Sequence, residues 1–145
     1  MLFRSRTEAA ANSHVGWATV NGNDFATYSS TLGVLPVTTV AFPATSSATV
    51  NALLSGSATL SDATNFSLNS LKMAPTIAGL SLNISGAGAL STNAFLLAGN
   101  TDFSILNSGT GTGGITGPGG PRYFQIPSAI LTVGEIGRAS CRERV

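Results

Sequence analysis

Residues able to carry out catalysis are few in this chain of 145 residues. His14 is the only histidine and Cys141 is the only cysteine. A Ser-His-Asp triad, or a zinc site built on histidine, would therefore depend on His14 alone. We interpret His14 as an ordinary polar residue without a catalytic role.

Three aspartates offer a second kind of chemistry. Asp24, Asp62 and Asp102 would form a carboxylate cluster if they were stacked on one face of a repetitive β structure, as in polysaccharide-cleaving enzymes or a calcium site. Each of them, however, follows a polar residue in a turn context, where Asp commonly accepts hydrogen bonds from nearby backbone amides. We favour the turn role and keep the carboxylate cluster as the alternative.

A glycine-rich stretch matches the residue pattern of a nucleotide-binding motif. Gly109–Gly114 matches G-x-G-x-x-G, which binds a dinucleotide only where a helix follows and places its N-terminus against the pyrophosphate. The residues that follow here, 115–121, contain three glycines and two prolines and cannot form a helix. We therefore predict a surface loop over Gly109–Pro121. We expect no cofactor, no metal site and no enzymatic activity.

Aromatic side chains could bind a carbohydrate by stacking on its sugar rings. Trp17, Phe25 and Tyr28 lie close in sequence and could form such a platform, although we favour packing in the first strands as their role. If the chain contacts a ligand or a surface through aromatic residues, we expect Trp17, Tyr28 and Tyr123 to make the contact.

Both ends of the chain resemble translated sequencing-adapter DNA. Residues 136–145 match one reading frame of a common library adapter, and residues 1–5 match the end of its partner, both in frame. Segments of this kind are set aside before the fold is considered. We therefore treat 1–5 and 136–145 as adapter-like, and 6–135 as an internal segment of a longer protein.

Setting these ends aside changes the charge balance. The whole chain has seven basic and six acidic residues. The basic residues that remain are few and dispersed, whereas phosphate binding needs clustered Lys and Arg, so we expect no nucleic-acid partner. The remainder has no cysteine, which suits surface proteins that cross a periplasm, and no run of about 18 apolar residues that could span a membrane. The charged residues of 6–135 are Arg6, Lys72 and Arg122 against Glu8, Asp24, Asp62, Asp102 and Glu135.

The composition indicates β structure. Charged residues make up 9% of the chain, and Ser, Thr, Asn, Gly and Ala dominate, while the helix formers Glu, Lys, Gln and Arg are scarce. The mean hydropathy is +0.29, which argues against disorder. We predict an all-β protein.

Alternation of apolar and polar residues locates the strands. Leu80–Ile84 alternates cleanly, which places three aliphatic side chains on one face. Residues 66–68 and 71–73 also alternate, but with the phase shifted by one residue, so we expect a bend or bulge at Asn69–Ser70. Segment Ala89–Leu97 is predicted as strand or turn. The other predicted strands are Gly16–Val20, Phe25–Tyr28, Val34–Phe42, Val50–Leu54, Ala58–Leu60, Phe103–Ile105, Phe124–Ile126 and Leu131–Val133.

Short strands at close spacing fit a sandwich, a barrel or a solenoid. The nearly chargeless alternation favours a solenoid, in which one strand face lines a narrow dry core and the other carries small polar side chains. Asparagine recurs beside the strands and tolerates the left-handed backbone that sharp corners need. We predict a β-solenoid with rungs of about 20–30 residues, with a β-sandwich as the alternative. The recurring asparagines are Asn65, Asn69, Asn83, Asn93, Asn100 and Asn107.

One segment resembles a known family. Residues 15–28, Val-Gly-Trp-Ala-Thr-Val-Asn-Gly-Asn-Asp-Phe-Ala-Thr-Tyr, resemble a stretch that precedes the rungs in bacterial proteins with autotransporter-associated β-strand repeats. Asn69–Met73 and Gly79–Leu82 resemble the rungs themselves, whereas the Gly-Thr-Leu-Thr-Leu-x-Gly signature of later repeats is absent. The resemblance implies an exported passenger domain, folded over 6–135 as a right-handed parallel β-helix that is incomplete at both ends. In that family the passenger domain often precedes an outer-membrane barrel, which would lie outside this chain.

Three functions fit these observations. The first is a structural or adhesive segment of an exported bacterial surface protein, without catalysis, whose rungs stack on flanking rungs of the parent chain. Its partners would be a host surface, matrix or polysaccharide, and its location extracellular, at the bacterial cell surface. The second is a β-helical carbohydrate-active or tail-spike-like domain, which requires convergent carboxylates. The third is a carbohydrate-binding β-sandwich module, which requires antiparallel ladders.

Overall fold

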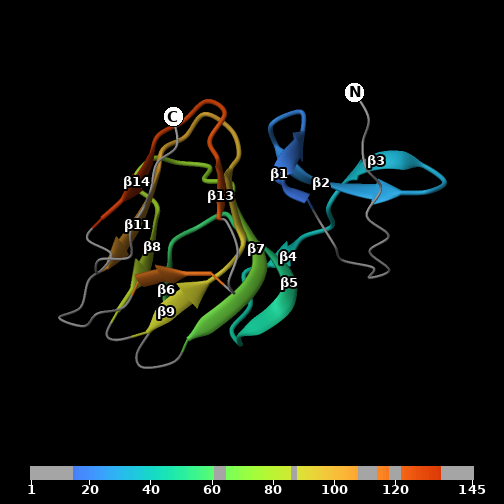
Figure 1. Ribbon diagram of the computed structural model, residues 1–145. Coiled ribbons are helices and arrows are strands. Elements are labelled where there is room, and N and C mark those ends of the chain that lie inside the picture. The colour runs from blue at the N-terminus through green and yellow to red at the C-terminus, as the bar shows by residue number, and fades with distance from the viewer. Residues whose placement is uncertain (1–14, 61–64, 86–87, 108–113, 118–121, 135–145) are drawn as a thin grey trace.

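The computed structural model describes residues 15–60, 65–85, 88–107, 114–117 and 122–134, with the backbone alone for 15–17 (Figure 1). The described residues form fourteen strands and no helix, which confirms the predicted all-β class. The strands are β1 (Val15–Val20), β2 (Asp24–Ser29), β3 (Gly33–Pro36), β4 (Val40–Ala41), β5 (Ser47–Leu54), β6 (Ala58–Leu60), β7 (Phe66–Met73), β8 (Ser81–Ile84), β9 (Ala89–Ser91), β10 (Ala94–Leu97), β11 (Phe103–Asn107), β12 (Gly114–Thr116), β13 (Tyr123–Gln125) and β14 (Leu131–Val133).

Residues 15–36 form a three-stranded antiparallel sheet, called here the N-terminal sheet, in the order β1-β2-β3. Asn21 and Gly22 have positive φ angles, 53° and 70°, and Asn23 N donates to Val20 O at 3.1 Å. Such an Asn-Gly turn joins antiparallel neighbours, whereas parallel strands need a crossover of about a dozen residues. The prediction of a parallel solenoid over 6–135 is therefore wrong for residues 15–36.

The strand predicted over Val34–Phe42 is interrupted. β3 ends at Pro36, which has no N–H to donate, and β4 begins at Val40. Between them Val37 is buried, and its N–H donates to Phe25 O at 2.8 Å. The interruption allows the chain to leave the N-terminal sheet and to enter the parallel part of the molecule.

From β4 onward every described strand pair is parallel, and these strands, called here the parallel body, lie in three rows (Figure 1). Row I is β4-β5-β7-β10-β13, and row II is β6-β8-β11-β14. Row III contains the start of β7, then β9 and β12. The antiparallel ladders that a sandwich requires are confined, in the described chain, to the N-terminal sheet.

The three rows enclose one apolar core. In each row a buried side chain lies over its register partner in the next strand, as Leu71 does with Phe95 in row I and Leu82 with Ile105 in row II. Burial of each such side chain contributes about 1.5–3 kcal/mol. The core therefore runs through the parallel body without a break. Its buried members are Ala52, Leu54, Phe66, Leu68, Leu71, Met73, Leu82, Ile84, Leu90, Phe95, Leu97, Phe103, Ile105 and Ile115.

β7 turns the corner between rows III and I. Phe66 and Ser67 pair with β9, whereas residues 70–73 pair with β10. The buried residues Ser70 and Leu71 are consecutive, so the alternation changes phase there. This confirms the bend predicted at Asn69–Ser70.

Side-chain hydrogen bonds hold this corner. Asn51 is buried, and its Oδ1 accepts hydrogen bonds from Asn69 Nδ2 and from Ser70 Oγ, both at 2.9 Å. The recurring asparagines tolerate the left-handed conformation but do not adopt it at the described corners. Asn21, in the hairpin, is the one described non-glycine residue with a positive φ, and Gly79 and Gly99 supply it in the parallel body.

Replacing Asn51 with Ala is expected to destabilise the protein by about 1–3 kcal/mol. The substitution leaves the fully buried Ser70 hydroxyl without this acceptor. Urea unfolding measures the change. Asn83→Ala is the matched control, because Asn83 is only partly buried and its Nδ2 lies 3.5 Å from Ser81 Oγ. An equal loss of stability in the two variants would contradict the assigned role of Asn51.

Candidate functional site

The two described aspartates each bind a different structural partner. Asp102 Oδ1 accepts a hydrogen bond from Ile130 N at 2.9 Å. This amide is 28 residues away, so the bond is not the predicted one to a nearby turn amide. Asp24 Oδ1 instead lies 2.5 Å from Lys72 Nζ. Asp62 and His14 lie outside the described residues. No group of three or more His, Cys, Asp or Glu that could hold a metal ion occurs in the described chain.

The glycine-rich stretch continues into a strand and not a helix. Gly114–Thr116 forms β12, which pairs in parallel with β9, so a helix N-terminus does not follow Gly114. Ile115 is buried over Leu90 in row III. The prediction of one surface loop over Gly109–Pro121 is therefore wrong at β12, because Ile115 packs in the apolar column that contains Leu90. Residues 109–113 and 118–121 lie outside the described residues.

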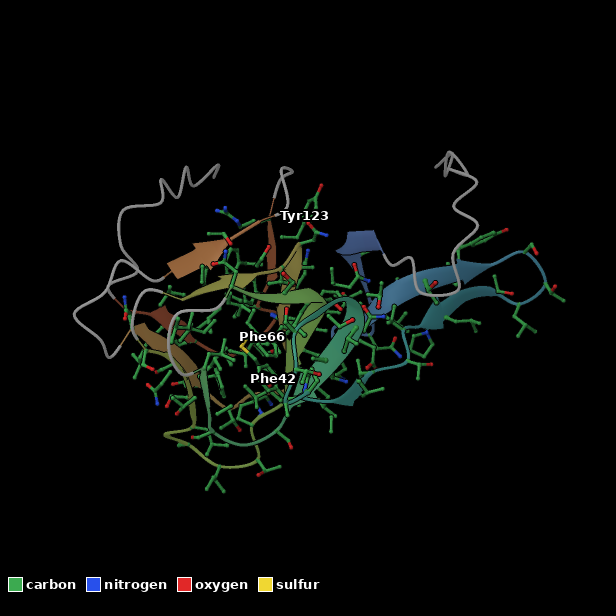
Figure 2. The ribbon with its side chains drawn as sticks, turned by 90° about the horizontal axis from the view of Figure 1, so that it is seen from below. Phe42, Phe66 and Tyr123 are labelled. Atoms are coloured by element: carbon green, nitrogen blue, oxygen red, sulfur yellow. The ribbon has the colours of Figure 1, made fainter. Side chains whose placement is uncertain are left out.

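The predicted aromatic contacts occupy different environments. Tyr28, in β2, is 69% exposed. Tyr123, in β13 and labelled in Figure 2, is half-buried and packs against the buried cluster that joins Phe25 and Val37 to Ala94, Leu96 and Ala98. Phe25 is 1% exposed, which confirms packing as its role. Trp17 lies in β1, but its side chain is outside the described part. The packing role favoured for Tyr28 is therefore wrong. Among the described side chains of the predicted contacts, Tyr28 is the ring that is open to a ligand.

Part of the N-terminal sheet packs on the outer face of row I at β10 and β13, while β3 projects away from the parallel body (Figure 1). All four residues of β10 are buried. Phe95 belongs to the core of the parallel body, whereas Ala94 and Leu96 pack with Phe25 and Val37. The uninterrupted apolar run 94–97 is the signal in the sequence for a strand covered on both faces.

In the described part of the chain, an ion pair links the N-terminal sheet to the parallel body. Lys72 lies between the buried Leu71 and Met73, so its side chain leaves β7 on the outer face, where it meets Asp24 of β2. The two side chains are 16% and 34% exposed, so solvent partly screens the pair. A partly exposed pair of this kind stabilises by about 1 kcal/mol or less.

Lys72→Met is expected to loosen the N-terminal sheet while leaving row II unchanged. The substitution keeps the apolar stem of the side chain but removes the ammonium that binds Asp24. Hydrogen exchange should show faster exchange in residues 24–29, with unchanged rates in β8 and β11. Arg122→Met, which removes an exposed positive charge elsewhere, serves as the control. Unchanged exchange in residues 24–29 of Lys72→Met would contradict the assigned role.

A shallow polar recess of about 290 Å³ lies where the β1-β2 turn meets the loops that follow β10 and β13. Its lining offers amide, hydroxyl and backbone groups but no charged side chain, so it suits hydrogen bonding to a neutral ligand and not acid–base chemistry. Its volume is at the lower limit for small-molecule sites. The lining residues are Asn21, Gly22, Asn23, Gly99, Asn100, Pro127 and Ser128.

The segment that carries the family resemblance, residues 15–28, forms β1, the Asn-Gly turn and most of β2. Comparison with family models, curated proteins and solved structures finds no match to this chain. The resemblance to autotransporter-associated repeats therefore stays a prediction. Function has to be argued from the geometry of the described residues.

Proposed function

We propose that this chain is a structural or adhesive segment of an exported bacterial surface protein, folded from β4 onward as a right-handed parallel β-helix. The order in which the chain visits the rows supports the β-helix. β5, β6 and the start of β7 lie in rows I, II and III, and the end of β7, β8 and β9 repeat that order. β10, β11 and β12 repeat it once more.

The spacing of register partners also supports a coil that repeats. Leu71 and Phe95 are 24 residues apart, and so are Phe66 and Leu90. Leu82 and Ile105 are 23 residues apart. These separations suit rungs that each bury an apolar face on the next, as in repeat proteins. In the parent chain the same packing would join these rungs to flanking ones.

The outer surface of row II supports a contact role. Ser81, Ser104 and Thr132 are register partners and form a column of hydroxyl groups on the side away from the core. Such a surface can hydrogen-bond a neutral polysaccharide or matrix component, and it carries no cationic cluster that would bind nucleic acid. Tyr28 adds an exposed ring that can stack on a sugar.

Both described aspartates and the buried Asn51 are committed to structural bonds. Asp24 binds Lys72, Asp102 binds Ile130, and Asn51 binds the β7 corner. These commitments favour a structural or adhesive segment over a carbohydrate-cleaving domain. The described residues contain no helix with the length and apolarity needed to cross a membrane.

Surface display tests the proposal. The full chain, placed between a secretion signal and an outer-membrane anchor, is expected to reach the cell surface, to be labelled by an antibody on intact cells and to mediate adhesion to a polysaccharide or matrix coating. Tyr28→Ala should lower adhesion while leaving surface labelling unchanged, because Tyr28 is exposed.

The control for this experiment is Leu71→Asp, which places a charge in the apolar core and should prevent both display and adhesion. Retention of the folded wild-type chain in the periplasm would contradict the export role. Normal display without adhesion to any coating would contradict the adhesive role and leave a purely structural one.

A further inference from the structure

We propose that the polar recess between the N-terminal sheet and the parallel body binds a single neutral sugar unit of the polysaccharide partner. The inference rests on the adhesive role in the proposed function and gives that role a binding site. Four observations carry it: polar side chains without protein partners, a lining without charge, loops held in fixed positions, and a location that spans two parts of the fold.

Polar side chains from three segments converge on the recess. Asn21 and Asn23 come from the β1-β2 turn, Asn100 from the loop after β10 and Ser128 from the loop after β13. No hydrogen bond joins any of these four side chains to another residue of the described chain. Each asparagine amide has two N–H donors and a carbonyl acceptor, and the hydroxyl does both. The recess can therefore donate to a ligand and accept from it.

The rest of the lining matches the two-sided character of a sugar ring. Pro127 is the apolar side chain of the lining, and Gly22 and Gly99 contribute backbone alone. A sugar ring has hydroxyl groups that donate and accept hydrogen bonds, and C–H groups that form an apolar face. The volume of about 290 Å³ is at the lower limit for small-molecule sites, so it suits one sugar unit with the rest of a polymer outside.

The electrostatic surroundings favour a neutral ligand. Asp24 directly follows Asn23, and Asp102 lies two residues after Asn100. Asp24 is paired with a lysine, whereas Asp102 is bound by the uncharged N–H of Ile130. No positive charge lines the recess, so an anionic ligand would have no partner there and would be repelled by Asp102.

The segments that line the recess are held in fixed positions. A side-chain carbon added at Gly22 would lie 3.5 Å from Pro127, so the hairpin turn is close to the loop after β13. The bond from Ile130 N to Asp102 Oδ1 ties this loop to the one after β10. Gly22 and Gly99 have φ angles of 70° and 86°, which glycine adopts readily. A site formed before the ligand arrives lowers the entropy cost of binding.

The location of the recess couples binding to the docking of the N-terminal sheet. β1 contacts β10 and β13 beside the recess (Figure 1). A ligand that touches the β1-β2 turn and both loops binds only while the N-terminal sheet is docked on the parallel body. Bound ligand therefore stabilises the docked state by mass action.

Titration of the isotope-labelled full chain with methyl glycosides of glucose, galactose, mannose and N-acetylglucosamine, followed by NMR, tests the proposal. At least one of them is expected to bind and to shift the amide signals of the recess residues. Asn23→Ala combined with Asn100→Ala should weaken this binding by about tenfold or more, because two hydrogen-bonding amides are lost. Asn65→Ala is the matched control, since Asn65 is an exposed asparagine outside the recess, and it should bind like the wild type.

Absence of binding by all four glycosides would overturn the proposal, and so would unchanged binding in the double variant. The methyl glycoside of glucuronic acid tests the charge preference and is expected to bind more weakly than that of glucose. Equal or tighter binding of the glucuronide would overturn the assignment to neutral sugars.

Hydrogen exchange tests the coupling. The glycoside that binds should slow exchange in residues 24–29 while leaving β8 unchanged. Unchanged exchange in residues 24–29 at saturation would show that the ligand does not bridge the two parts, and would overturn the assigned position.

Failure of the site and failure of the proposed function give different results. A chain that reaches the cell surface and adheres through Tyr28, but binds no glycoside in the recess, refutes the site and leaves the proposed function standing. A chain that binds the glycoside in solution but is neither displayed nor adhesive supports the site and contradicts the proposed function.

Discussion

Burial of one face of every row in a common apolar core is the constraint on which the rest of the structure depends. Parallel strands have no hairpin to hold them together, so neighbours separated by about 24 residues stay paired only if their inner side chains pack. Leu71 on Phe95 and Leu82 on Ile105 satisfy this condition in rows I and II. The backbone hydrogen bonds of the rows follow from this packing.

The constraint also explains where the polar residues lie. A residue at a corner faces neither fully inward nor outward, and the buried amide of Asn51 and hydroxyl of Ser70 bind each other there. Thr92, also buried at a corner, lies 3.3 Å from Asn69 O through its Oγ1. Polar groups at these positions are tolerated because each has a partner, and an unpaired one would cost about 1–3 kcal/mol.

Local alternation in the sequence predicted most of the strands, because a strand with one buried face leaves a period of two. Leu80–Ile84 and the phase shift at Asn69–Ser70 are the clearest cases. The N-terminal sheet was missed, although Asn21-Gly22 is a hairpin signal, since the apolar pattern of residues 15–36 does not distinguish antiparallel from parallel neighbours. Asp24 and Lys72 are 48 residues apart, and nothing local in the sequence predicts that they meet. The exposure of Tyr28 contradicts the packing role that its sequence context favoured and agrees with the alternative of a surface contact. The burial of all four residues of β10 depends on tertiary contacts.

The double coverage of β10 has a consequence for the order of folding. Its outer face packs against Phe25 and Val37, which precede Leu96 by 71 and 59 residues, and its inner face packs against the core of the parallel body. The apolar face of β2, which contains Phe25, is therefore covered only after the distant strand β10 has been synthesised and has folded. Contacts so far apart in sequence carry a large loop-closure entropy and slow the rate at which a chain reaches its native state. Until β10 is in place, Phe25 is exposed to water. The growing chain therefore depends on β10 covering Phe25 before another apolar surface binds it.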